Sequence, residues 1–186
     1  MNAATEFDLG PLTWVKGEID QALERAEEAF GQYIAEADLT RLKFCRTHVH
    51  QVHGALSIVS LDGITQVTES LEALLDALEE GRVAADDGIV AAVRHAMAGI
   101  RSYLDELMAG EPNQPLRLMP VYLELAKARG ISTARASDLF FPDLSLRPPK
   151  RATAAPRLAP DELRQVLRNE RARYQKGLLL WLTKPE

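Results

Sequence analysis

Three of the four histidines lie close together in one short segment, at His48, His50 and His53. Because each residue of a helix turns by about 100°, a helix through this segment places His50 and His53 on one face and His48 roughly opposite. Gly54 follows directly and leaves room for the close approach of a partner. An imidazole on a rigid helix with open space beside it has the setting of a nucleophilic or phosphate-carrying side chain.

The same face carries a polar, basic stripe at spacings of 3, 4, 3 and 4. Its members are Lys43, Arg46, His50, His53 and Ser57. Cations next to an imidazole stabilise the negative oxygens of a phosphoryl group. Two other interpretations stay open: surface histidines without chemistry, and a metal ion shared by His50 and His53. No Glu-x-x-His pair or cysteine partner accompanies these two residues, so we expect no metal.

The elements that position this face follow from hydrophobic periodicity, which is helical through most of the first 130 residues and nowhere alternates as in a strand. We expect four amphipathic helices, at about 11–37, 39–59, 62–81 and 86–110. Asp62 is the expected cap of the third, and Gly81 and Gly110 end the third and fourth. Short connections favour an all-α, antiparallel four-helix bundle. The second helix has the clearest apolar seam: Leu42, Cys45, Val49, Val52, Leu56 and Val59.

Beyond the four helices, the sequence predicts an extra helix over about 116–129, bent or begun again at Pro120, which packs on the bundle. The apolar stretch 139–144 should hold an extended segment against the helices, and Trp14 should pack at the bundle end. We therefore expect a helical bundle with its packed extension at 1–145, a Pro-rich linker at 146–160 and a C-terminal helix within 161–186.

Composition and charge exclude several classes of function. Residues 1–145 hold 12 Lys or Arg against 23 Asp or Glu, while residues 146–186 hold 10 against 4. The acidic bundle should repel nucleic acid and anionic lipid, and the basic last segment lacks an aromatic stacking platform. No apolar run reaches the ~18 residues that span a bilayer, and no signal peptide is evident. With one cysteine, Cys45, we expect a cytoplasmic protein without membrane insertion or nucleic-acid binding.

A family resemblance emerges from these residues. His50-Gln51-Val52-His53-Gly54-Ala55 resembles the signature of histidine-containing phosphotransfer (Hpt) domains, His-x-x-Lys/Arg-Gly-Ser/Ala, on the second helix of a four-helix bundle. Runs at 14–19, 44–54, 137–145 and 173–179 look like the N-terminal region of the hybrid histidine kinases that control type IV pili and twitching motility (ChpA/PilL type). Related pieces occur in their FimL-type scaffold relatives.

The resemblance implies a phosphorelay role in a two-component chemosensory system. His50 would accept a phosphoryl group, supported by Lys43, Arg46, His53, Gly54 and Ser57. The expected partners are receiver domains, a histidine kinase catalytic domain and other pilus chemosensory components. The chain would then be a fragment of a larger sensor kinase. It would need no cofactor of its own, because Mg²⁺ belongs to the receiver partner.

The sequence departs from the family pattern at two positions. His53 stands where a long cation is usual, and Ser60 stands where many Hpt domains have glycine. A degenerate Hpt-like interaction scaffold without phosphotransfer is therefore the alternative function. Catalysis by the chain itself is not expected, because no ATP-binding signature, glycine-rich phosphate loop or paired nucleophile and base is present.

Overall fold

The computed structural model describes residues 10–141 and 159–183 and divides the chain into two compact units, Met1–Pro142 and Asp143–Glu186. The described residues form helices and no strand, which confirms the all-α fold. The first unit contains α1 (Gly10–Glu36), α2 (Leu39–Ile58), α3 (Asp62–Glu79), α4 (Asp87–Met108) and α5 (Met119–Ala128). The second contains α6 (Pro160–Thr183). None of the described helices is long and apolar enough to span a membrane.

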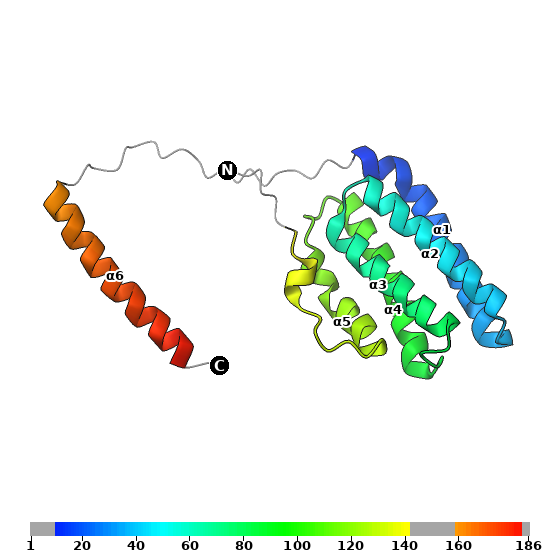
Figure 1. Ribbon diagram of the computed structural model, residues 1–186. Coiled ribbons are helices and arrows are strands. Elements are labelled where there is room, and N and C mark those ends of the chain that lie inside the picture. Colours follow the sequence, from blue (N-terminus) through cyan, green and yellow to red (C-terminus); the bar gives the residue numbers. More distant parts are fainter. Residues whose placement is uncertain (1–9, 142–158, 184–186) are drawn as a thin grey trace. The chain divides into compact units, whose positions relative to one another are not determined.

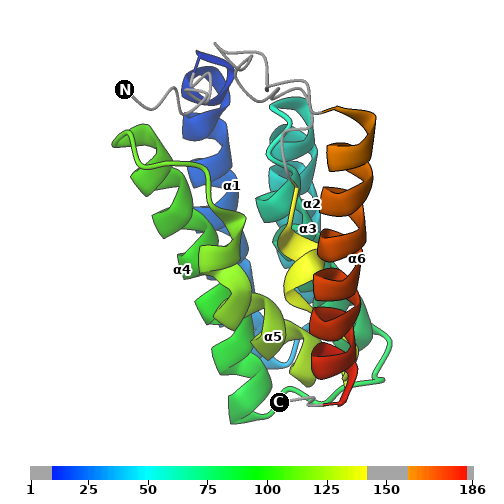
Figure 2. The ribbon, with the colours of Figure 1, turned by 90° about the vertical axis from the view of Figure 1, so that its left-hand side faces the viewer.

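Helices α1 to α4 form a closed bundle, shown in Figures 1 and 2. Each helix packs against the next, and α1 also contacts α4. The predicted seam of α2 is confirmed, since all six of its apolar residues are buried. Burial of that seam fixes the rotation of α2 about its axis, so the opposite, polar face must look outward.

Helix ends follow local backbone chemistry. Asp38 and Asp86 cap α2 and α4 by accepting hydrogen bonds from the Thr40 and Ile89 amides. Gly81 and Gly110 adopt φ of 69° and 93°, as predicted for residues that close helices.

The capping prediction for Asp62 is wrong. Leu61 is the N-cap residue of α3 and forms no side-chain cap, while Asp62 is the first helical residue. A carboxylate in that first turn still complements the helix dipole.

The extra helix begins again near Pro120, as predicted. A 3-10 turn, η1 (Pro115–Leu118), precedes α5, which packs on α3 and α4. A second turn, η2 (Ala136–Leu139), contacts α3 through the buried Leu139. Only Leu139 does what was expected of the stretch 139–144, because Phe140 and Phe141 are exposed and residues from 142 lie outside the described part.

Two apolar residues of α1 face away from the core. Trp14 is 88% exposed, so the prediction that it packs at the bundle end is wrong. It lies two residues after the buried Leu12, and a rotation of about 200° turns it outward. Ile34, near the C-terminal end of α1, is also exposed, at 37%.

In the second unit, α6 begins at Pro160, one residue before its predicted start, and proline suits a first helical position. Of the predicted linker, residues 146–158 lie outside the described part of the chain.

Candidate functional site

Helix α2 presents its histidines on a well-anchored frame. Cys45 belongs to the apolar seam of α2 and has no access to solvent. Burial raises the pKa of its thiol to about 12. A protonated, buried thiol is a core group and not a nucleophile. His48 is half-buried, and its Nδ1 lies 3.1 Å from Gln51 Oε1, away from the other two histidines. The chemistry of this helix therefore rests with His50 and His53.

His50 is held by a carboxylate from the neighbouring helix. Its Nδ1 lies 2.7 Å from Oε1 of Glu72 on α3. An ionised carboxylate only accepts hydrogen bonds, so in the neutral ring Nδ1 carries the proton and Nε2 keeps its lone pair. The His50 side chain is 70% exposed, whereas Glu72 is 21% exposed. The arrangement thus orients the imidazole and turns Nε2 toward solvent.

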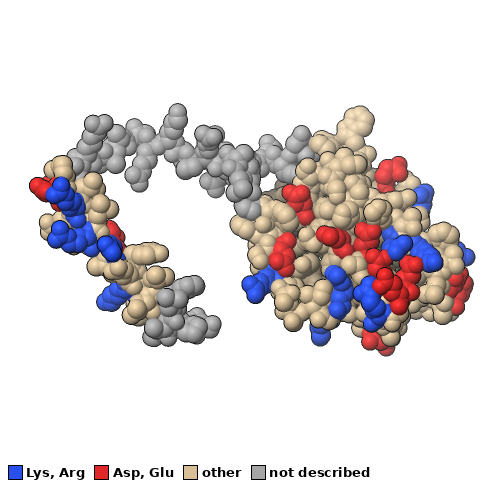
Figure 3. Space-filling view, in the orientation of Figure 1, with Lys and Arg blue, Asp and Glu red and all other residues tan. Residues whose placement is uncertain are grey.

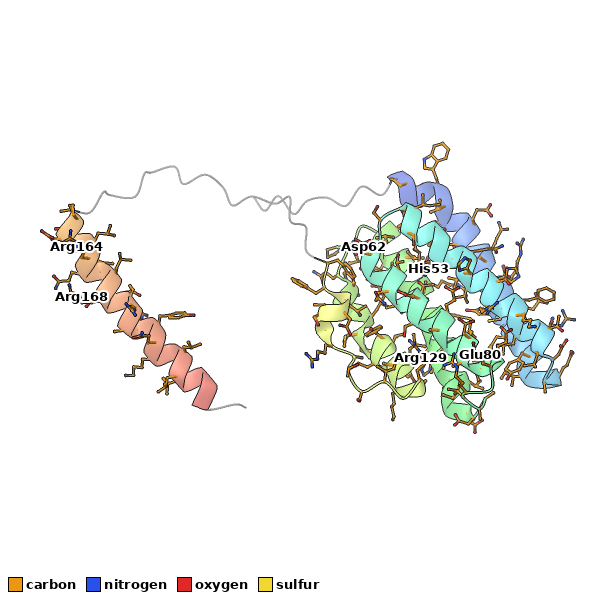
Figure 4. The ribbon with its side chains drawn as sticks, viewed as in Figure 1. His53, Asp62, Glu80, Arg129, Arg164 and Arg168 are labelled. Carbon is orange, nitrogen blue, oxygen red and sulfur yellow. The ribbon has the colours of Figure 1, made fainter. Side chains whose placement is uncertain are left out.

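His53, labelled in Figure 4, lies one turn further along α2 and is less exposed. Its ring stacks with that of His50 at a centroid distance of 6.2 Å and an interplanar angle of 12°. Its Nδ1 is 3.7 Å from the second oxygen of Glu72, too long for a hydrogen bond, and this buried atom has no hydrogen-bond partner among the described residues. His53 packs beside the exposed imidazole.

The two cations of the stripe are occupied by acids of α3. Arg46 NH1 lies 2.5 Å from Asp76 Oδ1 and 3.3 Å from Glu79 Oε2, and Lys43 Nζ lies 3.7 Å from Glu79 Oε1. The hydrogen bond to Asp76 is the main cause that raises the pKa of Arg46. In Figure 3, blue and red side chains interleave on the bundle face turned to the viewer. The cations of the basic stripe therefore form ion pairs that link α2 to α3.

Gly54 and Ser57 complete the face. A Cβ added at Gly54 would meet no atom within 4 Å, so the space beside His50 is open. Ser57 is exposed, but its hydroxyl donates to the carbonyl of His53 at 2.9 Å.

A shallow depression of about 270 Å³ lies beside His50. Its walls are Arg46, Thr47, His50, Glu72 and Asp76. The depression is open to solvent and large enough for a phosphoryl group.

The acids of α3 are functional candidates that sequence reasoning missed. Glu72, Asp76 and Glu79 follow at spacings of 4 and 3, which places them on one helix face. That spacing was readable, but the register of α3 against α2 was not. Among the described residues, no group of three or more His, Cys, Asp or Glu side chains is arranged to hold a metal ion.

A second histidine offers a natural comparison. His95 on α4 is 62% exposed, and its Nδ1 lies 3.2 Å from both carboxylate oxygens of Glu124 on α5. Gly99 follows at the same spacing as Gly54 follows His50, but a Cβ there would lie 3.2 Å from Val121. Gly99 thus serves the packing of α5, and no open space like that beside His50 follows His95.

Comparison with known proteins agrees with this geometry. The chain is 30% identical over 171 residues, 90% of its length, to the scaffold protein FimL of Pseudomonas aeruginosa, of which it covers 30%. It is 29% identical over 114 residues, 61% of its length, to the chemotaxis protein CheA of Cereibacter sphaeroides, of which it covers 16%. The chain thus spans less than a third of each of these relatives, and no solved structure matches it.

The family match coincides with the bundle. Residues 12–107 match the Hpt domain family, just over half of the chain, and this range runs from the start of α1 almost to the end of α4. The stretch contains His50, its carboxylate partner Glu72 and the open position at Gly54. The chain belongs to the Hpt domain family.

Proposed function

We propose that the chain is a phosphotransfer module in which His50 accepts a phosphoryl group on Nε2. The observation that carries this proposal is the 2.7 Å contact between His50 Nδ1 and Glu72 Oε1. It favours the tautomer in which Nε2 is the nucleophile, on a side chain that faces solvent beside the open position at Gly54.

In the proposed step, the Nε2 lone pair attacks the phosphorus of a phospho-aspartate in a receiver domain or the γ-phosphorus of ATP in a kinase domain. The N–P bond forms as the P–O bond breaks, and the aspartate carboxylate or ADP leaves. The Nδ1 proton stays on the ring and keeps its hydrogen bond to Glu72. Mg²⁺ and the groups that stabilise the moving phosphoryl come from the partner, so the chain acts as a carrier.

The system in which this module works is part of the proposal. The similarity to a protein named chemotaxis protein CheA supports a chemosensory relay with receiver and kinase partners. The similarity to FimL, together with the runs that resemble ChpA/PilL-type kinases, supports a cytoplasmic role in the control of type IV pili and twitching motility, within a larger sensor kinase.

A second candidate function is an interaction scaffold without phosphotransfer. It is favoured by the similarity to a protein named as a scaffold over 90% of this chain. It is also favoured by His53 in the position of the usual cation and by the engagement of Lys43 and Arg46 with α3. This function requires a folded bundle but no acceptor histidine.

The two functions separate in one experiment. The wild-type chain, His50→Gln and the control His95→Gln are incubated with a phosphorylated receiver domain of a type IV pilus chemosensory system, and acid-labile, base-stable label is measured. We expect label on the wild type and on His95→Gln and none on His50→Gln, with equal helicity in all three by circular dichroism. Absence of label on the wild type, with a receiver that loads other Hpt domains, would leave the scaffold function.

A further inference from the structure

A phosphoryl group on His50 needs a positive partner, and the face offers few. Toward the C-terminal end of α2 the next polar residues on the stripe are His53 and Ser57, and the Ser57 hydroxyl is bonded to the backbone. Toward the N-terminal end, Arg46 lies one helical turn away. Arg46 and His50 both line the depression, so the guanidinium is the cation nearest to the space that the phosphoryl group would fill.

In the unphosphorylated protein this guanidinium is held by Asp76 and Glu79, at 2.5 and 3.3 Å. The Arg46 and Asp76 side chains are 41% and 40% exposed. Ion pairs this open to water contribute little to the stability of a protein. The contact therefore orients Arg46 without binding it strongly, and Asp76 can be hydrated if Arg46 leaves.

Phosphorylation would change the charge of this small region. A phosphoryl group brings a charge of about −1.5 to −2 near neutral pH. It would join Glu72 and Asp76 around the same depression, which has no cation on its walls other than Arg46. A guanidinium forms bidentate, charge-assisted hydrogen bonds with phosphoryl oxygens. Glu79 keeps Lys43 within 3.7 Å, so it is not left without a cation when Arg46 moves.

We propose that Arg46 exchanges partners when His50 is phosphorylated. Its guanidinium releases Asp76 and binds the phosphoryl oxygens. Arg46 then contacts the phosphoryl group itself, in place of the cation missing at position 53, and Asp76 is the group that orients it beforehand. This inference rests on the proposed acceptor role of His50.

The test uses the full chain charged with phosphoramidate, a small phosphoryl donor that needs no protein partner. The ³¹P NMR signal of the phosphohistidine is followed against pH, with His50→Gln to assign it. A nearby guanidinium favours the doubly charged phosphoryl group. We expect the titration midpoint of the wild type to lie below that of Arg46→Gln by about half a pH unit or more.

Two further variants sharpen the result. Asp76→Asn removes the competing carboxylate and should move the midpoint below that of the wild type. Arg82→Gln is the matched control, because Arg82 forms an exposed ion pair with Glu80 outside the depression, and it should leave the midpoint unchanged. Circular dichroism checks that each variant keeps its helicity.

Equal midpoints for the wild type, Arg46→Gln and Asp76→Asn would overturn the exchange and leave Arg46–Asp76 as a static ion pair between α2 and α3. A third outcome separates the two proposals. If phosphoramidate phosphorylates His50 and Arg46→Gln shifts the midpoint, but no receiver domain phosphorylates His50, the proposed function fails and the inference about Arg46 survives. If His50 takes no phosphoryl group even from phosphoramidate, both are wrong.

Discussion

Replacing Glu72 by glutamine is the most direct perturbation of the acceptor. The substitution keeps the shape of the side chain and removes its charge. A hydrogen bond to a charged group contributes ~1.5–3 kcal/mol, against ~0.5–1.5 for a neutral one. Because His50 is 70% exposed, the loss should fall near the low end, at about 1 kcal/mol. If that difference is expressed in the transition state, transfer slows by about fivefold.

Glutamine also removes the constraint on the tautomer. Its amide can donate to Nδ1, and the proton then moves to Nε2, where it blocks attack. Both effects slow transfer, so fivefold is the minimum that the geometry predicts. The assay is the single-turnover rate of label transfer from a phosphorylated receiver, measured with a fast quench.

The matched control is Glu124→Gln, which removes the same kind of partner from His95. It should leave the transfer rate unchanged. A wild-type rate for Glu72→Gln would refute the reasoning, because the 2.7 Å contact would then play no part in preparing His50. Slowing by both variants would point to a general effect on the bundle.

Three further predictions concern stability, measured by urea unfolding. Ser60 adopts φ of 56°, a left-handed conformation that costs a non-glycine residue ~1–2 kcal/mol. Ser60→Gly should therefore raise the urea midpoint of unfolding. The control Ser57→Gly, inside α2, should lower it. A Cβ at Gly63 would lie 2.2 Å from Pro115 Cβ, so Gly63→Ala should cost ~1–3 kcal/mol by overpacking, while Gly54→Ala should not destabilise. Burial raises the pKa of Cys45 from 9.0 to about 12; the unfolded chain therefore loses this proton first, and stability should fall between pH 9 and 12, by at most ~1.4 kcal/mol per pH unit. Cys45→Ala should give a flatter profile, and an equal slope in both proteins would contradict this assignment.

The position of Ser60 shows which part of the fold one departure from the family pattern affects. Many Hpt domains have glycine ten residues after the acceptor, and this chain has serine there. The backbone at Ser60 is left-handed, the conformation that glycine adopts without strain. The departure therefore affects the turn between α2 and α3 and lies away from the acceptor depression.

Sequence alone determined the helices, the seam of α2 and the face that carries His50, because hydrophobic periodicity is a local property of the chain. The interval pattern from Leu42 to Val59 orients α2 wherever the rest of the protein lies. The same reasoning failed at Trp14, since the sequence does not reveal whether another part of the protein will cover a single apolar residue outside the buried face of α1.

Only the tertiary structure decided what surrounds the acceptor. Glu72 lies 22 residues beyond His50, and its contact depends on how the seams of α2 and α3 interlock, which fixes their relative height and rotation. The same register turned the basic stripe of Lys43 and Arg46 into partners of Asp76 and Glu79. Charges on one helix are readable from spacing, but their partners are set by the packing of two helices, because that packing is a sum over many side chains far apart in the sequence.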